Sequence, residues 1–407
     1  MKKIVQAWTG ISLVQRIVAG LGVGALLGMF VPSEGGIAIL GDVFVGALKA
    51  IAPLLVFFLV ISSLCYAGKS HGGVIRTVII MYMFSTFLAA IVAVTASSAF
   101  PVTLTLVDAA TDMAAPQGVA EVLRTLLMNV VTNPVQSLVS ANYIGILVWA
   151  VLIGIALRKA SDTTKQSLND ISAALSKTVT WIIQCAPFGI MGLVYNTVSV
   201  NGLSTFTEYG KLLAVLLGSM LFIYFVTNPI LVFWCIRKNP YPLIFKCLKK
   251  SAITAFFTRS SAANIPINME ACAEMGLDKD TYSVTIPLGA TINMDGAAIT
   301  ITVMTLAAAH TLGIAVDIPS AIILSILATL SACGASGVAG GSLLLIPMAC
   351  SLFGISNDIA MQIVGIGFII GVIQDSVETA LNSSSDLLLS ASAEFRQWRL
   401  EGKEIKF

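Results

Sequence analysis

Apolar runs of about twenty residues recur along almost the whole chain, and a helix of that length crosses the hydrocarbon core of a bilayer. Of the 407 residues, 57% are hydrophobic and only 11% are charged. Soluble domains carry about 25% charged residues, so this composition is typical of an integral membrane protein. The formal net charge of +2 favours neither nucleic acid nor a strongly acidic partner. We therefore expect an all-α membrane protein that has the lipid bilayer as a partner and binds no nucleic acid.

The first part of the chain predicts membrane-spanning helices over residues 15–32, 42–67, 77–99, 142–157, 174–198 and 209–236. Basic residues cluster between alternate spans, at 2–16, 69–76, 158–165 and 237–250, and again at 396–406. The connections on the other side hold only Arg124. Because cytoplasmic connections are enriched in Lys and Arg, the N- and C-terminal segments are predicted on the cytoplasmic side.

The pattern changes in residues 251–395. Two short apolar segments, 251–273 and 320–352, are interrupted by serine, asparagine or glycine, and each precedes a longer helix, at 282–311 and 356–394. Interrupted segments in matching positions are typical of the binding sites of transporters. We therefore predict two re-entrant hairpins, which form an inverted repeat with the helices that follow them.

A polar break lies in the middle of residues 282–311. Asn293 and Asp295 lie there between Gly289 and Gly296, where a charge costs about 2.5–3.5 kcal/mol. The glycines predict a locally unwound helix whose freed carbonyls could coordinate a cation. The alternative is a polar contact between helices.

Polar residues also line one face of the last helix. At about 100° per residue, Asp375, Thr379, Asn382 and Asp386 fall within about 60° of one another, and Glu378 borders them. A lone aspartate could be an end residue that snorkels to the interface, but four aligned polar groups indicate a binding face.

These features resemble the glutamate-transporter-like family of dicarboxylate and amino acid:cation symporters. The resemblance rests on Thr258-Arg259-Ser260-Ser261, on Asn293-Met294-Asp295-Gly296, on the glycine-rich second hairpin and on Asp375 to Asp386, and it extends over almost the whole chain. It implies eight transmembrane helices and two re-entrant hairpins in a homotrimer of the bacterial inner membrane. Residues 1–250 would be mostly scaffold, with the third and sixth helices partly in the transport domain, 251–395 the transport core and 396–407 a cytoplasmic tail.

The resemblance also implies where an amino acid substrate would bind. Its groups would be Ser260, Ser261, Val338, Asp375, Glu378, Thr379 and Asn382. Among these, Ser261 and the backbone around Val338 would hold the α-carboxylate, and Asp375 would pair with the α-ammonium group.

Sodium, the co-transported ion, would be held at three places. Asp386 with carbonyls of Gly289, Asn293 and Asn382 would form the first site, and carbonyls of Thr291 and Met294 with the second hairpin near Ser331 and Ser336 the second. The third would use Tyr82, Ser85, Thr86, Asn293 and Asp295. Hard oxygen donors of this kind suit a hard cation.

Two departures concern selectivity. Members that carry acidic amino acids have an arginine where this chain has Glu378, and a threonine where it has Ala297. The chain is therefore most similar to the bacterial serine/threonine:sodium symporter branch, which implies sodium-coupled uptake of small neutral amino acids by alternating access.

Two other functions remain open at this stage. A proton- or sodium-coupled carrier of dicarboxylates or acidic amino acids would need more cationic groups than Arg259 supplies. An intramembrane hydrolase would need a base beside Ser260 or Ser261, and neither histidine, His71 or His310, lies near them in the sequence. We therefore expect a transporter, not an enzyme, and no organic cofactor.

Overall fold

The computed structural model describes residues 11–31, 36–66, 73–106, 128, 131–335 and 340–405, and all regular structure in these ranges is helical. The helices of the first part are α2 (Leu13–Phe30), α3 (Ala38–Tyr66), α4 (Gly73–Ala99), α6 (Pro134–Val139), α7 (Tyr143–Ala156), α8 (Asp162–Gln184), α9 (Ala186–Asn201), α10 (Thr205–Phe222) and α11 (Asn228–Ile236). Those of the second part are α12 (Tyr241–Cys247), α13 (Ile253–Thr258), α14 (Ser261–Glu274), α15 (Lys279–Ile292), α16 (Asp295–Thr311), α17 (Ile318–Ala332), α18 (Ile346–Ser351) and α19 (Asn357–Leu400). Short 3₁₀ or π segments are η1 (Leu157–Lys159), η2 (Ile223–Thr227), η3 (Leu248–Ala252) and η4 (Ser342–Leu345).

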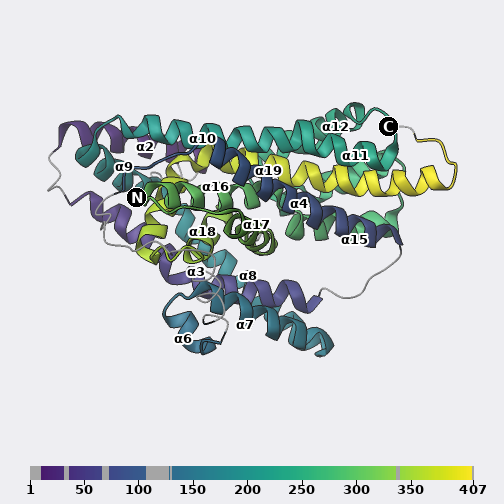
Figure 1. The fold of residues 1–407 in the computed structure, drawn as a ribbon, viewed down its shortest axis with the longest axis horizontal. Coiled ribbons are helices and arrows are strands. Elements are labelled where there is room, and N and C mark those ends of the chain that lie inside the picture. The colour runs from purple at the N-terminus through teal and green to yellow at the C-terminus, as the bar shows by residue number, and fades with distance from the viewer. Residues whose placement is uncertain are drawn as a thin grey trace.

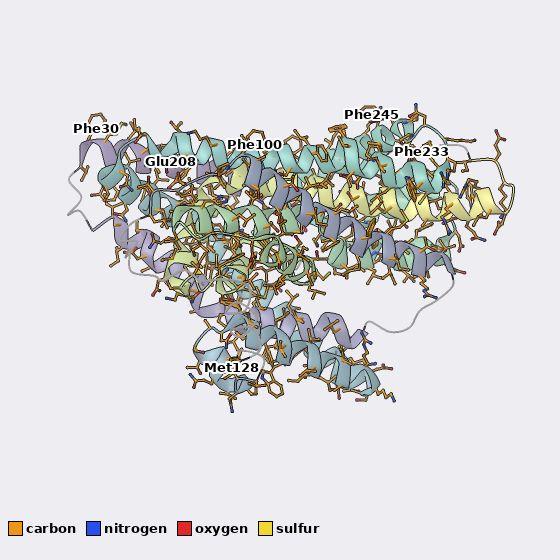
Figure 2. All side chains as sticks on the ribbon, viewed as in Figure 1. Phe30, Phe100, Met128, Glu208, Phe233 and Phe245 are labelled. Carbon is orange, nitrogen blue, oxygen red and sulfur yellow. The ribbon has the colours of Figure 1, made fainter. Side chains whose placement is uncertain are left out.

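The lengths and composition of these helices suit a membrane. Within the described ranges, 6 helical spans are long and apolar enough to cross a bilayer, or 7 if α8 and α9 form one bent span. Large apolar side chains project from the outer surface, among them Phe30, Phe100, Phe233 and Phe245 (Figure 2). The helix predicted over 142–157 is present as α7, but its 14 residues span only about 21 Å. α7 is therefore shorter than the hydrocarbon core.

Two predicted spans bend at a proline. The span expected over 174–198 is α8 followed by α9, and their axes differ by 55° at Cys185, just before Pro187. The π segment η2 precedes Pro229, which lies in the first turn of α11. Proline has no backbone N–H to donate, so the helix adjusts locally at both places.

Glycines bring α2 close to α9. Gly20, Gly24 and Gly28 lie on one face of α2, and a Cβ added to them would lie 2.2, 2.5 and 2.9 Å from carbonyl oxygens of Pro187, Met191 and Tyr195. Small residues at this spacing let membrane helices pack backbone to backbone. α3 contacts α7, α8 and α9, so these five helices form one packed group.

The second group surrounds α19, which runs lengthwise among α4, α10, α15 and α16 (Figure 1). α4 packs on α16 and α17, and α10 packs on α16 and α19. The third and sixth predicted spans therefore contact residues 251–395 directly. An ion pair between Lys49 of α3 and Asp358 of α19 links the two groups.

Candidate functional site

The apolar segment 282–311 is broken where the sequence predicts. α15 ends at Ile292 and α16 begins at Asp295, with Asn293 (φ −99°, ψ 79°) and Met294 (φ −119°, ψ 55°) outside helical geometry. The Asn293 N–H still donates to Gly289 O at 2.9 Å, and Met294 O accepts from Ala298 N at 3.0 Å. The break places the oxygen-bearing side chains of Asn293 and Asp295 in the protein interior, as an intramembrane ion site requires.

Asp295 lies at this break and is fully buried. Ser85 Oγ donates to its Oδ2 at 2.9 Å, and Thr86 Oγ1 donates to its Oδ1 at 3.2 Å. Ser85 and Thr86 come from α4, more than two hundred residues earlier in the chain. The structure thus brings together side chains that the family resemblance assigns to one sodium site.

Asp386 forms a second oxygen cluster beside the first. Asn293 Nδ2 donates to Asp386 Oδ1 at 2.9 Å, and Tyr82 Oη donates to the Asp386 carbonyl at 2.9 Å. Asn293 Oδ1 is buried without a hydrogen-bond partner. A buried acceptor without a donor is costly, and a cation would satisfy it.

Gly289 is needed for this close approach. A Cβ at this position would lie 2.8 Å from Asp386 Oδ1 and 2.8 Å from Tyr82 Oη. Only glycine leaves room there for the carboxylate and the phenol to reach the α15 backbone.

Asn382 connects the last helix to the start of α16. Its Oδ1 accepts from the Gly296 N–H at 2.7 Å, and its Nδ2 lies 3.4 Å from Met294 Sδ. Thr379 Oγ1 donates to the Asp375 carbonyl within α19 at 2.8 Å. The polar stripe of α19 therefore contacts the break through Asn382 and Asp386.

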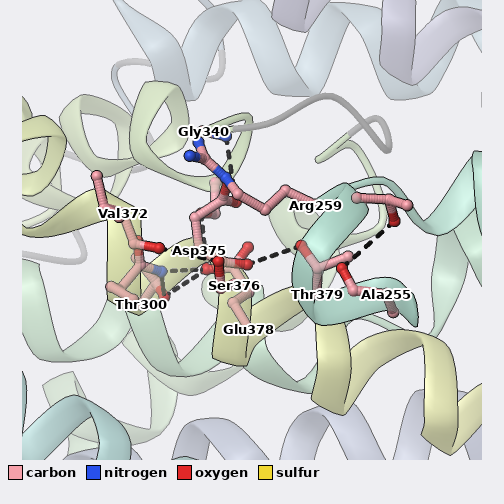
Figure 3. A network of polar contacts seen from close by, with 12 residues as sticks. Ala255, Arg259, Thr300, Gly340, Val372, Asp375, Ser376, Glu378 and Thr379 are labelled. Carbon is pink, nitrogen blue, oxygen red and sulfur yellow. Dashed lines mark hydrogen bonds and ion pairs between the residues drawn. The ribbon is translucent and has the colours of Figure 1, made fainter. Parts of the chain in front are cut away.

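Asp375 is the point where both hairpins meet α19 (Figure 3). Arg259 Nε donates to Asp375 Oδ2 at 2.7 Å, and the Gly340 N–H donates to Oδ1 at 3.2 Å. Both side chains of this ion pair are at most one-tenth exposed. The negative charge is thus balanced inside the protein by the tip of the first hairpin.

The tip of the first hairpin has a defined geometry. α13 ends at Thr258, and the left-handed conformation of the next residue, Arg259 (φ 52°), reverses the chain. Ser260 then caps α14, its Oγ accepting from Ala263 N at 3.2 Å. Ser261 is the first residue of α14 and is buried. This turn points the guanidinium of Arg259 at the last helix.

Glu378 lies apart from the substrate groups expected around it. Its Oε2 contacts Thr300 Oγ1 at 2.6 Å, Ser342 Oγ at 2.9 Å and the Gln374 amide at 2.5 Å. These hydrogen bonds lead to α16 and the second hairpin, and not to the Asp375–Arg259 pair (Figure 3). A position at the edge of the stripe turns the carboxyl toward α16, so the geometry does not favour the substrate-binding role expected from the sequence.

Thr291 and Ser331, two other residues expected to bind sodium, make no hydrogen bond to the buried aspartates of the site in the described part of the chain. Thr291 has an exposed side chain, with Oγ1 donating to Leu288 O at 2.7 Å. Ser331 is buried and bonds its own helix, α17, at Leu327 O. Ser336 and Val338 lie outside the described residues.

A further polar cluster was not expected. Asn264 Nδ2 donates to Ser383 Oγ at 2.8 Å, and Asn268 Nδ2 donates to Ser383 O at 2.9 Å. Ser251 Oγ also accepts from Asn264 Nδ2, at 2.9 Å. These residues fasten the first hairpin to α19. The spacing of Asn264 and Asn268, one turn apart on α14, was the available signal.

Comparison with known proteins matches residues 13–394 to the model of the sodium:dicarboxylate symporter family. A protein of Streptococcus thermophilus named serine/threonine transporter SstT is 56% identical over 400 residues, 98% of this chain and 100% of that protein. A protein of the same name from Bifidobacterium adolescentis is 55% identical over 406 residues, 100% of this chain and 94% of that protein. One from Streptococcus agalactiae is 56% identical over 395 residues, 97% of this chain and 98% of that protein.

Proposed function

The chain belongs to the sodium:dicarboxylate symporter family, and from that premise we propose that it is a sodium-coupled symporter of serine and threonine. The relatives that it resembles over nearly their full length are named for these two substrates. The protein is a membrane transporter and not an enzyme.

The observation that carries the sodium part of the proposal is the pair of oxygen clusters at the α15–α16 break. Asp295 and Asp386 are buried carboxylates with hydroxyl and amide partners, and Asn293, whose Oδ1 has no partner, contacts the second of them. Oxygen donors of this kind fit a hard cation such as Na⁺, and the ion would neutralise otherwise costly buried charges. We assign sodium to these clusters as cargo.

The substrate would lie next to Asp375, between the two hairpin tips. An α-ammonium group is a cationic donor like the Arg259 guanidinium. It can therefore replace the guanidinium as the partner of the Asp375 carboxylate when the substrate is bound. Ser261 and the backbone of the second tip would hold the α-carboxylate, with Asn382 and Thr379 close by on α19. Glu378 has no direct substrate contact in this proposal, because its carboxyl is engaged with α16 and the second hairpin.

The charges of the core favour a neutral substrate. Arg259 is the only arginine or lysine in residues 251–278, and none occurs in 280–395. With a zwitterion bound, the Arg259 guanidinium and the α-ammonium group together balance Asp375 and the α-carboxylate. A second substrate carboxylate would therefore be buried without a cation, which disfavours a dicarboxylate or acidic amino acid.

The architecture follows as part of the same proposal. We propose eight crossings, counting the short α7, and two re-entrant hairpins made by α13–α14 and α17–α18. The group of α2, α3, α7, α8 and α9 would be the scaffold of a homotrimer in the inner membrane of a bacterium, with both ends of the chain cytoplasmic. The second group, residues 251–395 with parts of α4 and α10, would carry the substrate.

Radiolabelled serine uptake into proteoliposomes tests the function. An inward sodium gradient should drive accumulation of serine, and an equal choline gradient should not. Uptake that is the same with both cations would refute the sodium coupling. Absence of serine and threonine uptake under a sodium gradient, with another amino acid carried, would refute the substrate.

A further inference from the structure

The carboxyl of Glu378 forms an unusual cluster between three elements. It lies on α19 and contacts Thr300 of α16 and Ser342 of η4, the segment that ends the tip of the second hairpin. Gln374, one turn earlier on α19, contacts both Glu378 and Thr300, at 2.5 and 2.7 Å. All of these side chains are buried, and neither the sodium clusters nor the Asp375–Arg259 pair uses them.

No cation within the described residues balances this carboxyl. The nearest charged group that acts on it is the carboxylate of Asp375, three residues earlier on the same helix, whose charge is already matched by Arg259. On the elements packed against it, the other titratable groups have their own places. Asp295 bonds Ser85 and Thr86, Cys350 of α18 lies against Thr305, and His310 lies at the far end of α16. An ionised Glu378 would be an unpaired buried charge beside a like charge, a state that a buried group avoids by neutralising itself.

The hydrogen-bond geometry gives an independent reason. Three contacts end on the single oxygen Oε2 of Glu378. A carboxylate oxygen has two lone-pair sites, so an ionised group cannot accept all three well. A carboxylic acid resolves this, because its oxygen donates one bond and accepts the others.

The Gln374 amide is a donor in this cluster, because its Nε2 donates to both Glu378 Oε2 and Thr300 Oγ1. The acceptor of a carboxylic O–H is therefore a hydroxyl, which can both donate and accept. Ser342 Oγ, 2.9 Å from Glu378 Oε2, is in place to accept that bond.

We propose that Glu378 is a proton-binding site, a carboxylic acid that donates to Ser342 and accepts from Gln374 and Thr300. The proton lets Glu378 hold the second hairpin against α16 without adding a negative charge beside Asp375. Glu378 is thus a positioning residue that acts on the substrate site through Ser342 and through Gly340, two residues earlier, which contacts Asp375. This assignment does not depend on which amino acid is carried.

Infrared difference spectroscopy of the full-length protein in lipid nanodiscs tests the proposal at neutral pH. The spectrum of the wild type minus that of Glu378→Gln should contain the carbonyl stretch of a protonated carboxyl and no loss of carboxylate bands. The matched control is Glu270→Gln, an exposed carboxyl on α14, which should lose carboxylate bands only. Loss of carboxylate bands in Glu378→Gln would overturn the proposal.

A second pair of variants covers the case in which Glu378→Gln does not assemble. Thr300→Val and Ser342→Ala keep Glu378 but each removes one hydrogen-bond partner. Each should shift the protonated carboxyl band of the wild type, because the frequency of that band depends on its hydrogen bonds. A protonated band that is absent from the wild type, or that neither variant moves, would also overturn the proposal.

Discussion

Asp386 is the residue whose charge matters most to the proposed sodium clusters. Asp386→Asn is nearly isosteric but removes that charge, and it also makes the membrane core less polar. Because a hydrogen bond or contact to a charged group contributes about 1.5–3 kcal/mol, we expect sodium affinity in uptake to fall more than about tenfold. Glu270→Gln on the exposed face of α14 is the control. Wild-type sodium dependence in Asp386→Asn, at normal expression, would disprove the assignment.

Gly289 offers a steric test of the same cluster. In Gly289→Ala the new Cβ would lie within 2.8 Å of both the Asp386 carboxylate and the Tyr82 hydroxyl, so one of them must move. We expect weaker sodium activation of serine uptake, measured as a higher half-activating sodium concentration. Gly218→Ala in α10, where a Cβ meets nothing within 4 Å, should leave it unchanged. Equal sodium activation in the two variants would argue against a cation at Gly289.

The single positive charge of Arg259 should determine which amino acids compete with serine for uptake. With one cation already paired to Asp375, the site can balance a zwitterion but not an additional side-chain carboxylate. We expect tenfold excess threonine to suppress labelled serine uptake strongly, and the same excess of aspartate or glutamate to have little effect. Suppression by aspartate equal to that by threonine would show that the core holds another cationic partner.

The sequence predicted contacts where a family motif was present and missed them where only helical periodicity was available. The cluster of Asp295, Ser85 and Thr86 could be inferred through the family resemblance. The partners of Glu378 could not, because helical periodicity places Glu378 at the edge of its own stripe but does not say which neighbouring helix fills that side. Thr300 and Ser342 have no pattern of their own that would single them out among the many serines and threonines of the chain.

At the scale of elements, the break between α15 and α16 was the most predictable feature. Two polar residues between glycines rarely occur inside an apolar span unless the helix is interrupted there, and α15 ends at Ile292. The bend between α8 and α9 was harder to place, since a proline kinks a helix by an amount that depends on packing. The glycine face of α2 could have been recognised from the four-residue spacing of Gly20, Gly24 and Gly28.

The first hairpin gives an element-scale prediction about stability. Ser383→Ala removes the hydroxyl that Asn264 and Asn268 both approach, and it leaves buried amide hydrogens with fewer acceptors. Such a loss costs about 1–3 kcal/mol, so thermal unfolding in detergent should shift to lower temperature. Ser392→Ala is the matched control, because the Ser392 hydroxyl bonds Leu388 O of its own helix. Equal shifts in the two variants would mean that the cluster does not fasten the hairpin.

At the scale of the whole molecule, the two packed groups suggest how the protein works. α19 and its hairpins contact one another through buried polar groups, whereas α2, α3 and α9 pack through apolar surfaces and glycines. A core whose charges are satisfied internally can move as a unit without exposing them to lipid. The ion pair between Lys49 and Asp358 lies between the groups and would have to break in such a movement.

The last prediction follows from the charge that such a core carries. If the proposed core moves inward and back once per cycle, the fixed charges of Asp295, Asp375, Asp386 and Arg259 contribute no net charge, and a serine or threonine zwitterion adds none. The net charge moved is therefore that of the sodium ions. Each elementary charge gains about 2.3 kcal/mol per 100 mV, roughly a fiftyfold concentration ratio. We expect an inside-negative potential, set by potassium and valinomycin, to accelerate sodium-driven serine uptake into proteoliposomes. Uptake that is indifferent to the potential would mean that another ion leaves in exchange for sodium.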